Sequence, residues 1–287
     1  MWIADGWQDY ELLSCGGGEK LERWGRQILV RPDPQAIWEV DKRSKLWRQA
    51  NARYSRSATG GGHWEKNDLP QSWPIRYKEL TFQVKPMNFK HTGLFPEQAA
   101  NWDFAMEAIR GAGRPIRVLN LFAYTGGATM ACARAGAQVC HCDAAKGMVQ
   151  WARENRELCG LPEDSTRWIL DDALKFVQRE ARRGHFYDGI LMDPPSYGRG
   201  PGGEDWKLEN ELYGLVKASS EALCDDPLFF LINGYTTGFQ ASVLGNMIDM
   251  CVTPRFGGLM TADEVGLPVT AGGVLPCGAS GRWEKKE

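Results

Sequence analysis

Hydrophobic and polar positions follow two different patterns along the chain, and the change falls near residue 90. Before it, short apolar runs such as residues 27–30 and 80–84 are separated by glycine- and proline-rich breaks, which is typical of short strands joined by long loops. After it, helical apolar spacing alternates with short apolar runs, which indicates a parallel sheet covered by helices. We therefore predict a small β-rich domain at residues 1–88 and an α/β domain at residues 89–287.

The pattern of the α/β domain predicts a Rossmann-like sheet of seven strands. Five apolar runs are expected to form its parallel strands, at residues 116–122, 138–142, 166–170, 187–192 and 228–232. Helices are expected at residues 95–111, 126–135, 146–159, 173–183 and 209–223. The tail at residues 259–283 predicts two further strands, joined by Gly272-Gly273 into a C-terminal antiparallel hairpin.

Composition favours a packed globular protein, since hydrophobic residues make up 43% of the chain and charged residues 24%. No targeting segment is visible at the start, and the longest strongly apolar run, Leu228–Ile232, is too short to cross a bilayer. The eight cysteines are scattered without the spacing of a disulfide framework or a zinc site. We expect reduced thiols, no metal and a cytoplasmic location.

Charge is divided unevenly between the two parts of the chain. Residues 1–90 contain 15 Lys/Arg against 11 Asp/Glu, and the rest contains 19 against 25. Six basic residues lie within residues 42–56, interleaved with Trp47 and Tyr54. This basic strip has two open interpretations: contacts to RNA phosphates and bases, or a solvated surface whose aromatic side chains are turned inward.

Candidate ligand-binding residues follow the first three predicted strands, at the sheet edge where α/β folds bind ligands. The first strand leads into Thr125-Gly126-Gly127, which permits a sharp turn close to a ligand. The second ends at Asp143, whose carboxylate suits the two hydroxyls of a ribose. The third ends at Asp171-Asp172-Ala173, where an acid and a backbone amide can read an adenine. Capping of the next helix by Asp171 or Asp172 is the competing interpretation of these two acids.

The fourth strand ends at Asp193-Pro194-Pro195-Ser196-Tyr197, the most informative motif of the chain. Two consecutive prolines fix the backbone and remove two amide donors, which leaves carbonyl groups available to a ligand. An acid in front of them can orient or deprotonate a nucleophilic nitrogen. The motif predicts the place where an acceptor is bound.

The order of these motifs resembles that of class I S-adenosylmethionine (SAM)-dependent methyltransferases that act on amines and bases. With Phe95-Pro96-Glu97-Gln98 ahead of the first strand, and residues 266–269 and 276–280 near the end, the series resembles the bacterial rRNA large-subunit methyltransferase family. Members of that family modify cytosine C5 or guanine. The resemblance covers about residues 80–287, and residues 1–80 resemble the small β-rich domain that precedes the catalytic domain there.

This resemblance implies SAM as the cofactor, RNA and especially rRNA as the substrate, and no metal or membrane. Phe122 to Gly126 would line the methionine part of SAM, and Asp143 would hold its ribose. The implied cofactor contacts are Gln98, Asn101, Asn120, Phe122, Ala123, Tyr124, Thr125, Gly126, Asp143, Ala144, Asp172, Ala173 and Asp193. The implied acceptor contacts are Asp193, Pro194, Pro195 and Tyr197.

The residues after the fourth and fifth strands bear on the acceptor atom. Cytosine-C5 chemistry in the family uses a cysteine nucleophile, yet no cysteine directly follows either strand, and the fifth ends in Asn233-Gly234-Tyr235. We therefore favour a nitrogen acceptor. Methyl transfer to a protein or small molecule, a nicotinamide-dependent oxidoreductase and a non-catalytic RNA-binding protein remain alternatives. A poor glycine fingerprint and the Asp-Pro-Pro motif weigh against the oxidoreductase.

Overall fold

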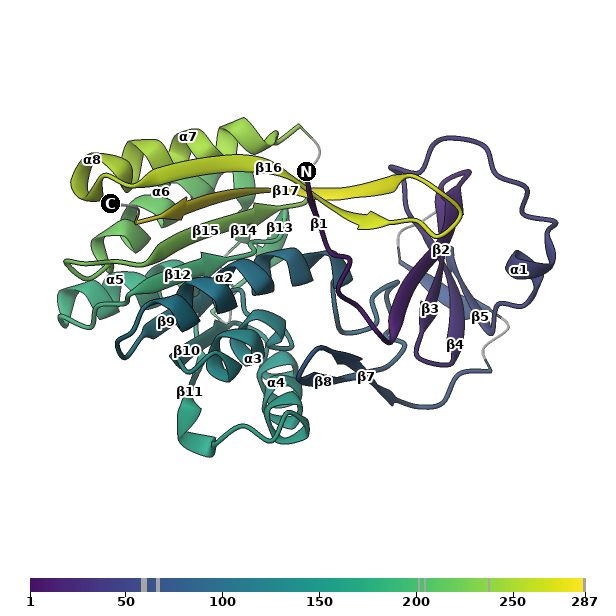
Figure 1. Cartoon of the computed structure of the whole chain (residues 1–287), viewed down its shortest axis with the longest axis horizontal. Coiled ribbons are helices and arrows are strands. Elements are labelled where there is room, and N and C mark those ends of the chain that lie inside the picture. The colour runs from purple at the N-terminus through teal and green to yellow at the C-terminus, as the bar shows by residue number, and fades with distance from the viewer. Residues whose placement is uncertain (58–60, 66–67, 201, 204, 237, 286–287) are drawn as a thin grey trace. The chain divides into compact units, whose positions relative to one another are not determined.

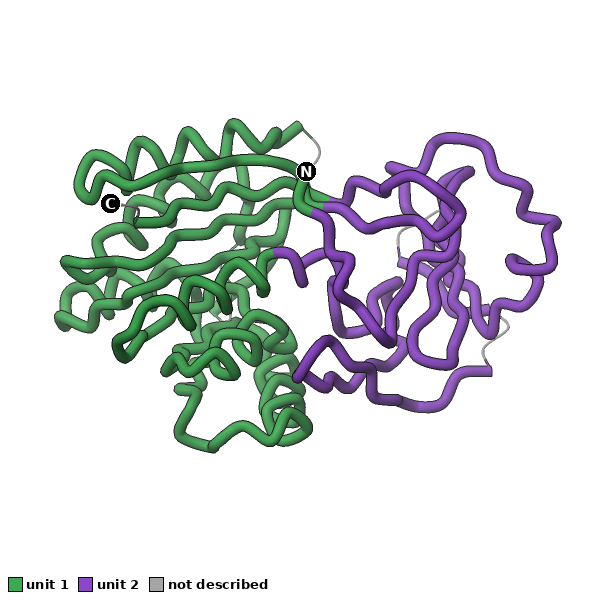
Figure 2. The backbone as a smooth tube through the Cα atoms, viewed as in Figure 1, with its two compact units in different colours: residues 1–2, 101–265, 278–287 green, residues 3–100, 266–277 purple. Residues whose placement is uncertain are grey.

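The computed structural model describes nearly the whole chain (Figure 1), namely residues 1–57, 61–65, 68–200, 202–203, 205–236 and 238–285. It divides into two compact units, which Figure 2 colours separately. The larger unit contains residues 1–2, 101–265 and 278–287, and the β-rich unit contains residues 3–100 and 266–277.

The β-rich unit takes up more of the chain than the sequence predicts. It includes residues 89–100 and 266–277, which the sequence assigns to the α/β domain. Local hydrogen bonds within the unit account for the difference. The Trp7 indole N–H donates to the carbonyl of Pro96 at 2.9 Å, and the amide of Thr270 donates to the carbonyl of Leu12 at 2.9 Å.

The larger unit is built on an eight-stranded sheet in the order β1-β16-β17-β15-β12-β9-β10-β11. Its strands are β1 (Trp2–Ile3), β9 (Arg117–Leu121), β10 (Gln138–Asp143), β11 (Thr166–Leu170), β12 (Gly189–Met192), β15 (Phe229–Gly234), β16 (Leu259–Pro268) and β17 (Val274–Glu284). The five strands from β11 to β15 are parallel, and β17 is antiparallel to β15. The seven predicted strands are confirmed, and the two-residue β1 adds an eighth at the edge.

Helices cover both faces of this sheet. They are α2 (Ala99–Gly111), α3 (Gly127–Arg134), α4 (Lys146–Leu158), α5 (Ala173–Arg182), α6 (Leu208–Glu221), α7 (Ala241–Cys251) and α8 (Thr253–Phe256). Leu119 and Leu121 of β9 point to one face, into a core that they share with Phe176 of α5 and Leu215 of α6. The alternate side chain Asn120 points to the other face and contacts α3. Helices α7 and α8 are not predicted by the sequence.

The β-rich unit holds a five-stranded sheet, a separate two-stranded pair and one short helix. The sheet has the order β2-β3-β4-β5-β6, and β7 pairs with β8. The elements are β2 (Tyr10–Gly16), β3 (Glu19–Trp24), β4 (Gln27–Pro32), α1 (Lys45–Arg48), β5 (Ala52–Arg56), β6 (Gly62–Glu65), β7 (Trp73–Tyr77) and β8 (Leu80–Val84). Leu21, Val30 and Trp47 form a small core between the sheet and α1. Within the described residues of the whole chain, no helix is long and apolar enough to span a membrane.

Candidate functional site

The strand order of the larger unit reverses between β9 and β12. From β9 the chain continues outward to β10 and β11, and then returns to form β12 and β15 on the other side (Figure 1). Because these strands are parallel, their carboxyl ends meet at one edge of the sheet, the place where such sheets bind ligands. The predicted residues after β9, β10, β11 and β12 are therefore brought to the same edge.

The loop after β9 has an unusual backbone. Phe122 and Tyr124 have backbone φ angles of 53° and 51°, in the left-handed region that residues other than glycine seldom adopt. Gly126 follows with a φ angle of 85°. Each non-glycine residue in such a conformation costs of order 1–3 kcal/mol, and such strain is concentrated at functional sites. A side chain at Gly126 would also come within 3.1 Å of Ala152. The fold thus holds a tight, strained turn at the switch point.

Asp143, at the end of β10, holds this loop through its carboxylate. One carboxylate oxygen accepts the amide of Tyr124 and the other accepts the amide of Ala145, both at 2.8 Å. The Asn155 side chain supports the loop from α4, since its amide donates to the carbonyl of Thr125 at 2.9 Å. Burial raises the pKa of Asp143 above its ordinary value of 3.8, although the two backbone amides act in the opposite direction. The carboxylate is fixed in place beside the loop.

Asn120 of β9 contacts the first turn of α3 in the protein interior. Its side-chain amide donates to the Thr129 hydroxyl at 3.0 Å, and this hydroxyl lies 2.9 Å from His141 Nδ1. Burial lowers the pKa of His141 to about 3, so its ring is neutral. The predicted cofactor contact of Asn120 stays a prediction, and the bond to Thr129 joins its side chain to the start of α3.

The two acids after β11 take different partners. Asp172 caps α5, because its Oδ1 accepts the amide of Lys175 at 2.9 Å. Asp171 accepts the amide of Asp172 at 2.8 Å and the guanidinium of Arg179 at 2.6 Å. The capping interpretation is confirmed for Asp172. A further role of Asp172 and the adjoining Ala173 toward adenine stays a prediction.

The Asp-Pro-Pro motif follows β12 directly, and two of its groups are held by neighbouring segments. Asp193 Oδ1 accepts the side-chain amide of Asn233 at 2.9 Å, and the Pro195 carbonyl accepts the Trp206 indole N–H at 2.6 Å. Sequence reasoning missed both donors. The sequence analysis notes Asn233 at the end of the fifth strand without giving it a role toward Asp193, and nothing in the sequence pattern points to Trp206.

Trp206 reaches the motif from a short antiparallel pair, β13 (Tyr197–Arg199) and β14 (Asp205–Lys207). Its ring also packs against Phe122, with the ring centres 4.9 Å apart. Tyr197 is 54% exposed, and its hydroxyl donates to Asp205 at 3.0 Å. Tyr197 can therefore present its ring to a ligand, as the predicted acceptor contact requires.

Three remaining predicted residues have different surroundings. Gln98 is buried in the 3-10 turn Pro96–Gln98 of the β-rich unit, and Ala144 is half-buried directly after Asp143. Asn101 lies in the first turn of α2, where its side-chain amide donates to the Ser280 hydroxyl at 3.0 Å. Cofactor contacts of these three residues stay predictions.

The basic strip is partly neutralised by two acids, Glu19 and Asp41, of which Asp41 pairs with Arg43 at 3.1 Å. Lys42 donates to Glu19 at 2.6 Å, and Arg53 pairs with the other oxygen of the same carboxylate. Trp47 and Tyr54 are only 4% and 3% exposed, so neither ring can stack on a base. The inward interpretation of the two aromatic residues is confirmed, while Arg48 and Arg56 lie exposed at the surface.

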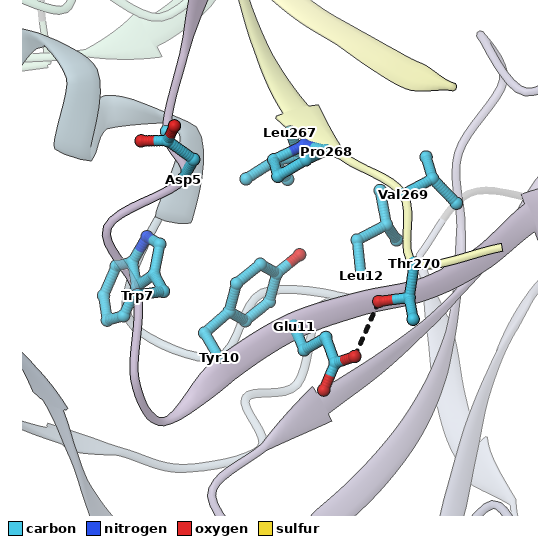
Figure 3. Close-up of a pocket in the computed structure, with 10 residues that line it drawn as sticks. Asp5, Trp7, Tyr10, Glu11, Leu12, Leu267, Pro268, Val269 and Thr270 are labelled. Atoms are coloured by element: carbon cyan, nitrogen blue, oxygen red, sulfur yellow. Dashed lines mark hydrogen bonds between the residues drawn. The ribbon is translucent and has the colours of Figure 1, made fainter. Parts of the chain in front are cut away.

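The β-rich unit contains a pocket of about 190 Å³ (Figure 3). Trp7, Tyr10 and Leu12 line one side, and the Thr270 hydroxyl donates to Glu11 at 2.6 Å at its rim. The lining includes no residue assigned to SAM or to the acceptor. In the parts of the chain that the structure covers, no group of three or more His, Cys, Asp or Glu side chains could hold a metal ion.

A parallel sheet of this order, with acids after successive strands, defines a nucleotide-cofactor-binding α/β protein. The chain belongs to the family of SAM-dependent methyltransferases, whose family model matches residues 22–209. SAM is therefore the cofactor, and the nicotinamide alternative is set aside.

Similarity to individual proteins agrees with this family. Ribosomal RNA large subunit methyltransferase I of Photobacterium profundum is 34% identical over 188 residues, which are 65% of this chain and 45% of that protein. The solved SAM-dependent methyltransferase of Agrobacterium tumefaciens is 37% identical, with a TM-score of 0.92 over 98% of this chain and 92% of that one. The chain spans less than half the length of the curated rRNA methyltransferase relatives that it matches.

A second solved structure shares the fold alone. It is described as a methyltransferase complexed with S-adenosylhomocysteine (SAH), the product that SAM leaves after methyl transfer. It is 18% identical, with a TM-score of 0.74 over 97% of this chain and 76% of that one. The groups at the strand ends fit such a cofactor chemically. A fixed carboxylate at Asp143 can accept hydrogen bonds from ribose hydroxyls, and the tight turn at Gly126 lets the backbone approach a ligand.

Proposed function

We propose that the protein transfers the methyl group of SAM to a nitrogen atom of an RNA base, in rRNA, in the cytoplasm. The observation that carries this proposal is the placement of Asp193-Pro194-Pro195 after β12, beside β9 and at the same sheet edge as Asp143. Residues for the cofactor and for an amine acceptor therefore lie on neighbouring strands. Holding two reactants in line accounts for much of the rate gain in such transfers.

The chemistry divides between the cofactor and the chain. SAM supplies, when bound, a methyl group on a positively charged sulfur that is already activated. Asp143 holds the ribose, and the strained turn at residues 122–126 supports the methionine part. Asp193 accepts a hydrogen bond from the acceptor amine, orients its lone pair and takes up the proton that the nitrogen releases.

A nitrogen acceptor is favoured by the state of the thiols. None of the eight cysteines forms a disulfide bond, as in proteins of reducing compartments. Burial raises the pKa of Cys132 to about 12 and that of Cys140 to about 11, so neither supplies a thiolate at neutral pH. Residues 193–207 and 233–240, which come after β12 and β15, contain no cysteine. Addition of a thiolate to a cytosine ring therefore has no cysteine available at these two strand ends.

RNA as the substrate is supported by similarity to rRNA large subunit methyltransferase I. The direct test is to incubate the protein with labelled SAM and rRNA from a strain lacking its gene, and to identify the labelled nucleosides by mass spectrometry. We expect a base methylated on nitrogen. Label in cytosine C5 would overturn the nitrogen acceptor, and label only in protein or small molecules would overturn the RNA substrate.

The exposed part of the basic strip gives a second test of RNA binding. Replacing Lys45, Arg48 and Arg56 with glutamine should weaken RNA binding and flatten its salt dependence by up to ~2 in log–log slope, because each single-strand phosphate contact contributes about 0.7. Filter binding between low and moderate salt measures this slope.

Arg53→Gln is the matched control for the triple variant, since Arg53 is already paired with Glu19 and should contribute less to the slope. SAM affinity should be unchanged in both variants. An unchanged slope in the triple variant would show that the basic strip is a solvated surface without RNA contacts.

A further inference from the structure

A continuous chain of hydrogen bonds runs from Asp193 into the interior of the larger unit. Asn233 donates to Asp193 at 2.9 Å, and the Ser280 hydroxyl donates to Asn233 Oδ1 at 2.6 Å. The Asn101 amide donates to Ser280 at 3.0 Å, and Arg282 donates to Asn101 Oδ1 from two nitrogens, at 3.0 and 2.8 Å. The chain of contacts joins α2, β17 and β15 to the end of β12.

The direction of every bond in this chain is set by its two ends. A guanidinium has donors only, so Arg282 requires the oxygen of Asn101 to face it. The Asn101 amide must then donate to Ser280, whose single hydrogen is left for Asn233. An ionised carboxylate accepts only, so Asn233 must turn its amide toward Asp193. Both asparagine orientations are thus determined by charge.

The members of the chain are also tightly enclosed. Asn233 and Ser280 are fully buried, and they lie opposite each other in the antiparallel β15–β17 pair. Arg282 is 7% exposed and lies over the ring of Trp2 at 3.7 Å and that of Phe104 at 5.0 Å. Hydrogen bonds in such an interior are stronger than in water, and a broken one leaves its neighbours without compensation. Burial and these hydrogen bonds therefore hold every member of the chain of contacts except Asp193 in one orientation.

We propose that Asn233 is the positioning residue for Asp193, and that Ser280, Asn101 and Arg282 hold Asn233 in the orientation that donates to it. This inference rests on the proposed function, in which the Asp193 carboxylate faces the acceptor nitrogen. Fixing one carboxylate oxygen through Asn233 aims the group before substrate binds. A purely structural role, joining β15, β17 and α2, would support folding without affecting the reaction rate specifically.

Ser280→Ala tests the proposal, because it removes the central hydroxyl with little change in volume. We expect kcat for rRNA methylation to fall on the order of 10- to 100-fold, as misplaced reacting groups do, with SAM affinity unchanged. Ser280→Thr keeps the hydroxyl and should recover most of the rate. Ser165→Ala is the matched control: its buried hydroxyl donates to the Pro162 carbonyl at 2.7 Å just before β11, and its loss should leave kcat unchanged.

The outcomes separate this inference from the proposed function. A wild-type kcat in folded Ser280→Ala would overturn the positioning role, and so would an equal loss in Ser165→Ala. If Ser280→Ala does not fold, Ser280→Cys carries the same test, since a thiol is a weak donor. If the wild-type protein methylates no RNA, the proposed function fails, and the positioning role is then tested by the ¹³C NMR chemical shift of the Asp193 carboxyl group. A chemical shift that changes in Ser280→Ala but not in Ser165→Ala supports the positioning role, and an unchanged chemical shift overturns it.

Discussion

Replacing Asp193 with alanine is expected to lower methyl transfer by at least ~100-fold while SAM affinity stays near that of the wild type. Asp193 follows β12 and contacts Asn233 through one carboxylate oxygen, whereas Asp143 carries the predicted ribose contact. Loss of the carboxylate removes the group that orients the acceptor amine and receives its proton. Single-turnover rates with rRNA and calorimetry with SAM measure the two quantities separately.

Two further variants define the role of this carboxylate. Asp193→Asn can still accept the Asn233 amide, but it then presents a donor to the acceptor amine, so methyl transfer should fall nearly as far as in Asp193→Ala. Asp164→Ala changes an exposed aspartate before β11 and should leave the rate unchanged. Near-wild-type transfer by Asp193→Ala would contradict the mechanism.

Replacing Asp143 with alanine is expected to weaken SAM binding by roughly ten- to a hundredfold. Hydrogen bonds to a charged group contribute ~1.5–3 kcal/mol each, and each 1.4 kcal/mol is tenfold in affinity. The variant also removes the acceptor of the Tyr124 amide, which helps to hold the strained turn. Calorimetry with SAM measures the loss, and an unchanged affinity would remove Asp143 from the site.

The wild-type protein offers the matching test of Asp143 without any substitution. Ribose binding uses the ionised carboxylate, and burial raises the pKa of Asp143 above the ordinary 3.8. SAM affinity should be highest above this raised pKa and should fall as the pH drops through it. The fall should begin at a higher pH than it would for an aspartate with the ordinary pKa. An affinity that stays constant down to pH 3.8 would contradict a ribose contact by this group.

The fold of the larger unit was largely predictable because its central strands β9, β10, β12 and β15 are mostly buried and rich in apolar residues. Strand β11 and the hairpin around Gly272-Gly273 follow directly from apolar runs and turn residues. Helices α7 and α8 were missed between two predicted strands. The β-rich unit was predicted only in outline, since its short strands alternate with loops and its core depends on distant contacts, such as that of Trp47 with Leu21.

The candidate site was predictable where it consists of residues next to strand ends, and not where it depends on tertiary contacts. Asp143 and Asp193 could be found from their positions alone. The left-handed backbone of Phe122 and Tyr124 could not, because neither residue type favours it. Trp206 reaches the Pro195 carbonyl through tertiary folding, which no local pattern records.

The most direct test of a shared cofactor and acceptor site is a crystal structure of the protein with SAH. We expect the ribose hydroxyls within hydrogen-bonding distance of Asp143, the amino-acid part beside the turn at residues 122–126, and the sulfur facing Asp193 and Pro194. Adenosine bound elsewhere, such as in the pocket beside Trp7 and Tyr10 of the β-rich unit, would contradict the placement of the reaction at the strand ends.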